Sequence, residues 1–443
     1  MLTQVGATLV GIIDMMMVGH YATIDFAAVS FSNAIFFTVM VFAMGALMGI
    51  TPLVGKQVGH KHILPHCQQD EVDEGIAHSL KAAWVFTLLL AVVTLLLLGA
   101  CYPFLDSFGQ DPEVAVTARQ YYGLSVLSIV PFLFFCTEKQ FLEGLGNTTF
   151  AMVVSIGMNL LNIALNYVLI FGHLGFPAMG ATGAGIATLI ARTLMPVIFF
   201  TGILLHREWR RYLHTSTRQP LLPGLRQYWQ VGLPIGLQTF AETIAFTLSS
   251  IIVGWLSKET LAAHQIAIQI SDITFMLAVG IGSATTIRVS HQLGKGDLHA
   301  VRMASHASIH LVLLVNTIGA VIMICLRHYI PYIFTNDPEV IRIAADLILC
   351  AGLFQYADGL QCVGAAMLRG ITDVKRPMIY AFVAYIGIAI PVGLFFTYTI
   401  HLGAVGMWIG FIVGLSCAAA FFHIRFRRLM QRNYINSTPK QSF

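Results

Sequence analysis

Long apolar stretches alternate with short polar segments along the whole chain. A helix needs about 20 predominantly apolar residues to cross the hydrocarbon core of a bilayer. Because backbone polar groups find no partner in lipid, runs of this length predict membrane-spanning helices. The pattern predicts twelve spans, near residues 1–19, 26–55, 77–100, 119–141, 150–172, 181–205, 229–256, 262–289, 303–325, 341–367, 377–399 and 402–424.

The second half of the chain repeats the first half in the same order. The stretch VGHYATIDFAAVS at 18 matches VGWLSKETLAAHQ at 253, and DPEV occurs at both 111 and 337. Two copies of six spans without inversion predict lobes related by an axis along the membrane normal, with a substrate path between them. Matching residues of the two copies are 235 positions apart before the segment 60–74 and 226 positions apart after it. This places about nine extra residues of the first copy within 60–74.

We therefore expect an all-α integral membrane protein with two parallel-repeat lobes of six helices, residues 1–205 and 229–424. A basic linker, 206–228, separates the lobes, and a basic tail, 425–443, follows them. Compared with the span at 229–256, the first span looks short at its inner end. This leaves open whether the natural chain starts upstream of Met1.

Composition and charge support a membrane protein and predict its orientation. Only 10% of the residues are charged, against about 25% in soluble domains. Of the 25 Lys and Arg residues, 20 lie at the side of the linker and tail, four lie opposite, and Arg192 lies inside a span. The positive-inside rule then predicts cytoplasmic termini, as expected for a multi-pass protein of the inner membrane. The seven scattered cysteines predict neither disulfides nor a metal cluster.

Several motifs resemble those of the MATE (multidrug and toxin extrusion) family, and more closely its NorM-type branch. They are IDMMMVGH, TPLVGKQVG, LNIALNYVLIFG, GATGAGIAT, LAAHQIAIQI and AAMLRGITDVKRPM. The resemblance implies two six-helix lobes around a V-shaped cleft. It also implies export of amphipathic, mostly cationic small molecules in exchange for Na⁺ or H⁺, by a monomer in the bilayer, with no enzymatic activity and no nucleic-acid partner. The stretch GITPLVGKQ lacks the spacing of a phosphate-binding loop, so we expect no ATP site.

Four carboxylates lie inside predicted spans and away from the helix ends: Asp14, Glu242, Asp272 and Asp358. Each charged group costs about 2.5–3.5 kcal/mol at the centre of a span, so each is a candidate functional residue. The repeat does not duplicate three of them, because it places Ser249, Ala7 and Phe132 opposite Asp14, Glu242 and Asp358. This indicates that the two lobes carry different sites.

In the first lobe, Asn162 and Asn166 are spaced to share one helix face. Asn166 and Asp14 lie at a similar depth, roughly 8–9 Å from the outer ends of their spans. An acid and two amides at one depth predict an oxygen-rich site for a cation or a proton, although polar residues also join membrane helices without further function. The NorM-type pattern gives all three residues polar roles, and Thr188 is a weaker member of this site.

In the second lobe, the family pattern assigns the coupling ion to Glu242 and Asp358. The alternative is that these acids only pack helices together, bonded to Gln238, Gln355 or Gln361. The resemblance assigns no role to Asp272. It either faces the cleft and attracts cations or bonds locally to Ser271 or Thr274, and we favour the local bond.

Two other functions compete with cation-coupled antiport. A lipid-linked oligosaccharide flippase from a related family would carry several cations for phosphate groups, and Arg192 is the one found inside a span. A membrane enzyme would need a cluster of His or acidic residues near one face, which the sequence does not show.

Overall fold

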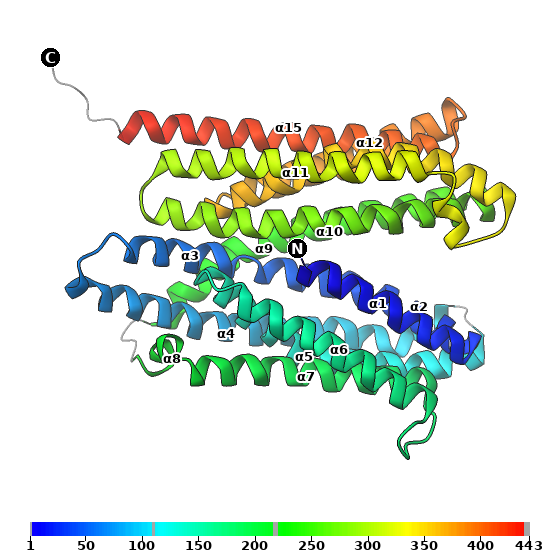
Figure 1. The fold of residues 1–443 in the computed structure, drawn as a ribbon, viewed down its shortest axis with the longest axis horizontal. Coiled ribbons are helices and arrows are strands. Elements are labelled where there is room, and N and C mark those ends of the chain that lie inside the picture. The colour runs from blue at the N-terminus through cyan, green and yellow to red at the C-terminus, as the bar shows by residue number, and fades with distance from the viewer. Residues whose placement is uncertain (1, 109–110, 216–219, 438–443) are drawn as a thin grey trace. The chain divides into compact units, whose positions relative to one another are not determined.

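The computed structural model describes residues 2–108, 111–215 and 220–437, and these residues form helices joined by short turns (Figure 1). In the first half the elements are α1 (Leu2–Tyr21), α2 (Thr23–Leu47), α3 (Ile50–Lys61), η1 (His66–Gln68), α4 (Gln69–Cys101), η2 (Tyr102–Phe108), α5 (Pro112–Gly144), α6 (Thr149–Phe171), α7 (Gly180–Leu205) and α8 (Arg207–His214). In the second half they are α9 (Leu221–Gly254), α10 (Lys258–Gly294), α11 (Leu298–Leu326), η3 (Ile330–Ile333), α12 (Pro338–Gly370), α13 (Lys375–Phe382), η4 (Val383–Ala389), α14 (Ile390–Leu394), η5 (Phe395–Thr399) and α15 (Ala404–Ser437).

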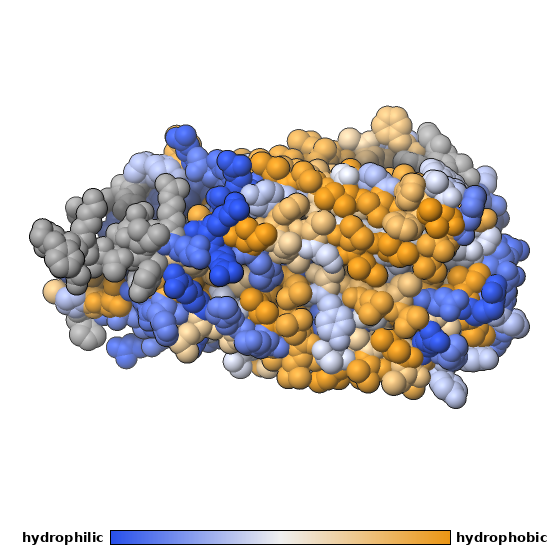
Figure 2. Space-filling model, turned by 90° about the horizontal axis from the view of Figure 1, so that it is seen from above, coloured by the Kyte–Doolittle hydropathy of each residue, from blue (hydrophilic) through white to orange (hydrophobic). Residues whose placement is uncertain are grey.

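The helices confirm a multi-pass membrane architecture. Within the described ranges, 11 helical segments are long and apolar enough to cross a membrane. They coincide with the second to twelfth predicted spans, and α1, a helix of 20 residues, occupies the position of the first. Apolar side chains form a broad band between hydrophilic ends on the face seen in Figure 2. Such a band is typical of a surface in contact with lipid.

The contacts divide the chain into two compact units, Leu2–Gly236 and Leu237–Phe443. In the first unit, α5 packs against α2, α4 and α7, and α6 packs against α1 and α7. In the second unit, α12 lies at the centre and packs against α10, α11 and α15. The boundary between the units falls inside α9, and the predicted linker contains the separate helix α8 and the first turns of α9.

Equivalent residues of the two copies make equivalent contacts. Each DPEV motif begins a helix, because the carboxylate of Asp111 or Asp337 caps the backbone N–H two residues later, at 3.0 and 2.9 Å. The last residues of these helices, Gly144 and Gly370, have no room for a side chain. A Cβ atom would lie 2.9 Å from Cβ of Val54 in one copy and 2.7 Å from a methyl of Val289 in the other.

In the second unit, α15 contacts its neighbours closely through three glycines spaced four residues apart. A Cβ atom on Gly406 would lie 2.4 Å from the backbone N of Thr397, and one on Gly410 would lie 2.4 Å from the carbonyl oxygen of Ala389. A Cβ atom on Gly414 would lie 2.4 Å from Cβ of Ala389. Small residues let membrane helices approach at backbone distance. Beside them, η4 and η5 are π-helical turns, which interrupt the regular bonding of this segment.

Candidate functional site

In the first unit, α1 and α6 bring three predicted site residues together. Asn166 donates a hydrogen bond from Nδ2 to Oδ1 of Asp14 at 2.5 Å. The side-chain amide of Asn162 lies 3.0 Å from Oδ2 and 3.3 Å from Oδ1 of Asp14, and its nitrogen donates when it faces the carboxylate. Both asparagines are buried, with Asn166 fully enclosed. The structure thus places the acid and both amides in direct contact.

Either end of the Asn162 amide can face Asp14, and each end suits a different form of the carboxyl group. With its oxygen turned towards Asn166, Asn162 accepts a hydrogen bond from Nδ2 at 3.3 Å. Its oxygen then faces the carboxylate, which suits a protonated Asp14 or a cation between the two oxygens. With its nitrogen turned towards Asp14, it stabilises the ionised, empty carboxylate. Thr188 is partly buried on α7, and the described contacts include no hydrogen bond from it to Asp14.

A positive charge lies inside the same unit. The guanidinium of Arg192 lies 5.2 Å from the ring centre of Phe36 and 4.8 Å from that of Phe132. Its Nη1 donates to the hydroxyl of Ser128 at 2.9 Å. Two aromatic faces and one hydroxyl stabilise a cation away from water. Arg192 is therefore held by α2 and α5, the helices that surround it, instead of being open to a ligand on all sides.

In the second unit, Gln361 joins the two predicted coupling carboxylates. Its Nε2 donates to Oε1 of Glu242 at 3.1 Å and to Oδ1 of Asp358 at 3.3 Å. Asp358 and Gln361 are buried on α12, while Glu242 comes from α9. The buried hydroxyl of Tyr385 lies beside Glu242 from η4. Two carboxylates, an amide and a phenol form a compact oxygen-rich site.

Of the three glutamines named as packing partners, Gln361 is thus the one that contacts the carboxylates. The side chain of Gln355 donates instead to the sulfur of Met323, and its backbone oxygen accepts from Nδ2 of Asn316 at 2.6 Å. No hydrogen bond of Gln238 is found within the described contacts. One amide that holds both acids is compatible with packing and with ion binding.

Asp272 is exposed on α10, and the favoured local bonds are not formed within the described residues. The hydroxyl of Ser271 donates to the carbonyl of Ala267 at 2.9 Å, and that of Thr274 donates to the carbonyl of Ser271 at 2.8 Å. Both hydroxyls therefore bond the backbone of their own helix, which is usual for Ser and Thr in membrane helices. The role of Asp272 therefore stays a prediction.

At the position that matches Asp14, the second unit holds a buried but uncharged network. Trp408 donates from Nε1 to Nδ1 of His264 at 3.1 Å, and Nε2 of the same ring lies 3.3 Å from the hydroxyl of Ser249. Since Nδ1 accepts, Nε2 carries the hydrogen, and the ring is the neutral tautomer. The two lobes therefore differ at this position, as the repeat predicts. The sequence did not single out His264.

Sequence reasoning also missed Glu138 on α5. Its side chain is 3% exposed, and its Oε2 has no hydrogen-bond partner among the described atoms. The neighbouring charges of Lys139 and Glu143 made this segment resemble the polar end of a span. The matching position in the second copy is Gly364, so the repeat itself was the signal that could have revealed a fourth unduplicated acid.

The described residues contain no group of three His, Cys, Asp or Glu side chains that could hold a metal ion. The two carboxylate sites instead combine acids with neutral amide side chains. Hard cations with low charge prefer such oxygen ligands, so both sites fit a weakly bound, exchangeable cation better than a resident transition metal.

Comparison with known proteins gives the family. Residues 1–168 and 234–395 match the MatE family. The chain is 34% identical to the probable multidrug resistance protein NorM of Rhizobium meliloti, covering 97% of this chain and 91% of that protein. It is 31% identical to the multidrug resistance protein NorM of Vibrio vulnificus, covering 98% and 94%.

Solved structures agree on the fold. A multidrug resistance MATE family transporter in an outward-facing conformation superimposes with a TM-score of 0.86 at 20% identity, covering 98% of this chain and 95% of that chain. A eukaryotic MATE transporter gives a TM-score of 0.84 at 18% identity, covering 98% and 96%. The internal repeat, the two unduplicated carboxylate sites and nearly full-length matches lead to one conclusion: the chain belongs to the MatE family.

Proposed function

We propose that this chain is a multidrug efflux transporter that exports amphipathic, mostly cationic small molecules in exchange for Na⁺ or H⁺. Its NorM relatives, which match over nearly their whole length, are named multidrug resistance proteins. The observation that supports coupling most directly is the buried carboxylate pair Glu242 and Asp358, joined by one amide donor of Gln361. Buried acids within membrane spans are costly and mark ion pathways.

The exchange requires that cargo and ion favour different conformations. A ligand shifts an equilibrium only by its difference in affinity for the two states. In our proposal, a cation or proton displaces the amide hydrogens of Gln361 from Glu242 and Asp358, and those of Asn166 from Asp14. Loading therefore changes the bonds between α9 and α12 in one unit and between α1 and α6 in the other.

We further propose that the protein works as a monomer in the inner membrane, with both termini in the cytoplasm, and uses no ATP. The excess of Lys and Arg at the ends that include the linker and tail supports this orientation. The family comparisons do not favour a lipid-linked oligosaccharide flippase, and the environment of Arg192 agrees with them. Its contacts with Ser128 and two aromatic rings leave it poorly placed to serve alone as a phosphate site.

Efflux from everted vesicles tests the proposal. Vesicles containing the full chain should accumulate a fluorescent organic cation when given a Na⁺ gradient or a pH gradient, and the effective gradient identifies the ion. The double variant Asp358→Asn with Glu242→Gln should reduce transport to the level of vesicles without the protein. The matched control is Asp346→Asn, because Asp346 is an exposed acid on the same helix. Unchanged transport in the double variant would overturn the coupling role of the pair.

A further inference from the structure

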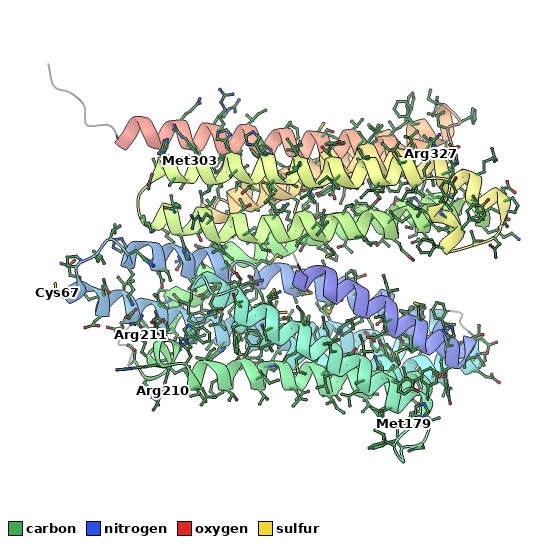
Figure 3. The ribbon with its side chains drawn as sticks, in the orientation of Figure 1. Cys67, Met179, Arg210, Arg211, Met303 and Arg327 are labelled. Atoms are coloured by element: carbon green, nitrogen blue, oxygen red, sulfur yellow. The ribbon has the colours of Figure 1, made fainter. Side chains whose placement is uncertain are left out.

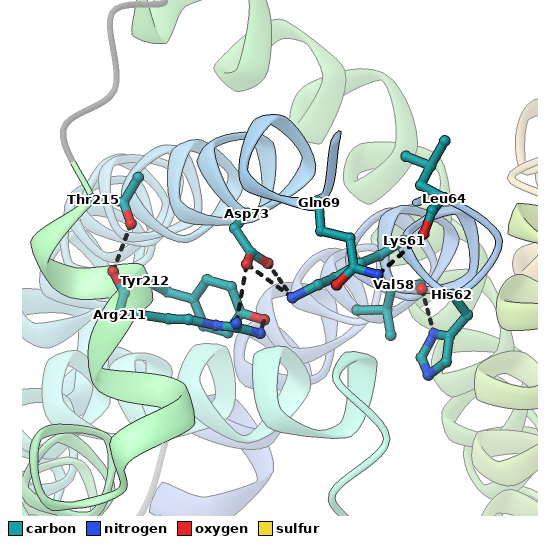
Figure 4. A network of polar contacts seen from close by, with 9 residues as sticks. All are labelled: Val58, Lys61, His62, Leu64, Gln69, Asp73, Arg211, Tyr212 and Thr215. Carbon is teal, nitrogen blue, oxygen red and sulfur yellow. Dashed lines mark hydrogen bonds and ion pairs between the residues drawn. The ribbon is translucent and has the colours of Figure 1, made fainter. Parts of the chain in front are cut away.

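A cavity of about 310 Å³ opens at one end of the first unit, beside α8. Its wall is built from the last residues of α3, the first turn of α4, the end of α5 and the inner face of α8. Of these residues, Lys61, His62 and Gln69 fall within 60–74, the segment in which the first copy carries about nine residues more than the second. Figure 4 shows the polar contacts along this wall. The cavity therefore belongs to the first lobe alone.

Two cations of the wall share one buried carboxylate. Lys61 donates to both oxygens of Asp73 at 2.6 and 2.8 Å, and Nη1 of Arg211 lies 3.1 Å from Oδ2. Asp73 is only 9% exposed, whereas Arg211 is 45% exposed. One carboxylate orients both cations but neutralises a single charge. Since an ammonium has three donors and a guanidinium five, donors remain for a second anion.

Tyr212 extends this donor set. Its hydroxyl accepts a hydrogen bond from Nη2 of Arg211 at 2.9 Å. Burial raises the pKa of Tyr212, and its interaction with the carboxylate of Asp73 adds to this, so the hydroxyl keeps its own proton. The wall thus combines an ammonium, a planar guanidinium and a phenol. This combination suits the non-bridging oxygens of a phosphate ester.

The wall also carries a negative charge. Glu208 is exposed on α8, three residues before Arg211, and lines the same cavity. The described contacts include no ion pair or hydrogen bond of its carboxylate. Asp73 already offsets one of the two cations, so the remaining charges are one positive and one negative, a few ångströms apart along one helix face. The charge of Glu208 also acts on Arg211, and a zwitterionic ligand complements both charges of this wall.

The surroundings place the cavity at the level of lipid headgroups. Leu205 at the end of α7 is 81% exposed, Leu222 at the start of α9 is 74% exposed, and Ile63 after α3 is 55% exposed. Arg210 and Arg211 project from the same end of the unit, close to the loop that carries Cys67 (Figure 3). Apolar side chains next to exposed arginines are typical of the membrane–water interface. This placement rests on the membrane spans and not on the proposed transport.

We propose that the cavity binds the headgroup of phosphatidylethanolamine. Lys61, Arg211 and Tyr212 hold the phosphate, and Glu208 accepts hydrogen bonds from the primary ammonium group. A quaternary choline has no hydrogen to donate to Glu208. A phosphoglycerol headgroup carries no positive charge, so it leaves Glu208 facing an anion. The wall therefore selects an amine-bearing phosphodiester over both other headgroups.

The test measures which lipids the purified full-length protein retains. The protein is equilibrated with equal amounts of phosphatidylethanolamine, phosphatidylglycerol and phosphatidylcholine that have identical acyl chains, and bound lipids are counted by native mass spectrometry. Wild type should retain phosphatidylethanolamine in excess. Glu208→Gln should reduce that excess by about fivefold, the upper range for a partly exposed ion pair, and leave phosphatidylglycerol unchanged. The matched control Glu71→Gln removes an exposed acid at the same end but outside the cavity.

Further arms separate the possible sources of the headgroup. Arg211→Gln should weaken retention of phosphatidylethanolamine and phosphatidylglycerol alike, and Glu208→Lys should shift the preference towards phosphatidylglycerol. Equal retention of the three lipids in wild type, or an effect of Glu71→Gln as large as that of Glu208→Gln, would overturn the proposal. Binding of soluble phosphoethanolamine without retention of the lipid would also overturn it, by identifying a water-soluble ligand. Loss of transport by itself bears on the proposed function and not on this site.

Discussion

Replacing Gln361 by leucine tests how the second-lobe carboxylates hold a cation. One nitrogen of Gln361 donates to both Glu242 and Asp358, at 3.1 and 3.3 Å. These bonds stabilise the ionised pair, so an incoming cation or proton has to displace them. A leucine of similar size removes the donor and leaves the two carboxylates to repel each other without it. We therefore expect the variant to bind the coupling ion more tightly than wild type.

The geometry sets the size of this effect. A hydrogen bond to a charged group contributes about 1.5–3 kcal/mol. A single nitrogen makes both bonds, and both bonds are fairly long. We therefore take about 1.5 kcal/mol as the contribution of the two bonds together. A difference of 1.4 kcal/mol corresponds to a factor of ten in affinity, so the dissociation constant should fall about tenfold. Slower release of the ion should then reduce the maximal rate of drug export.

The assay is ion-dependent thermal stabilisation of the purified protein in detergent, followed over a titration of Na⁺ and, separately, of pH. Gln355→Leu is the matched control, since Gln355 is a buried amide on the same helix that bonds Met323 and not a carboxylate. An unchanged or higher dissociation constant in Gln361→Leu would refute the reasoning. A higher constant would indicate that the amide oxygen of Gln361 is itself a ligand of the ion.

Two further predictions follow from packing and from the first-lobe site. Asn166→Ala removes a buried donor to Asp14 and should lower the free energy of unfolding by about 1–3 kcal/mol, measured as a lower melting temperature. Asn33→Ala should cost less, because this partly buried amide makes two long bonds to neutral groups, accepting from Tyr121 at 3.3 Å and donating to the sulfur of Met15 at 4.0 Å. The reverse order would contradict the assignment. Gly410→Ala would place Cβ 2.4 Å from the carbonyl oxygen of Ala389 and should sharply reduce the yield of folded protein in size-exclusion chromatography. The control Gly387→Ala meets no atom within 4 Å, and equal loss in both variants would show that the close approach of α15 is not the cause.

The grouping of the first-lobe residues could be predicted from helix geometry alone. The spacing of Asn162 and Asn166 fixed a common helix face, and counting residues from the ends of the spans put Asp14 at their depth. Both inferences depend only on helix geometry, which is the same in every helix. The structure brings the three side chains into contact, while their transport role stays a proposal.

Partners across helices could not be predicted in the same way. The sequence offered three glutamines for Glu242 and Asp358, and only the hydrogen bond from α12 to α9 identifies Gln361 as their partner. The burial of Glu138 and His264 depends on helices far away in the chain, so nothing in their local sequence distinguishes them from polar residues at a helix end. The π-helical turns at η4 and η5 likewise arise where α15 presses against this segment, and a hydrophobic pattern does not record them.

The segment that builds the cavity beside α8 has a consequence for the history of the chain. After a tandem duplication both copies have the same sequence. They stay interchangeable only as long as each copy can make the contacts that the other one makes. Lys61 and Asp73 now hold α8, a separate helix that follows the first copy, and the described residues up to Ser437 contain no such helix after the second copy. A chimera with two second copies would keep every span but lose the residues that hold α8, so the two halves can no longer be exchanged.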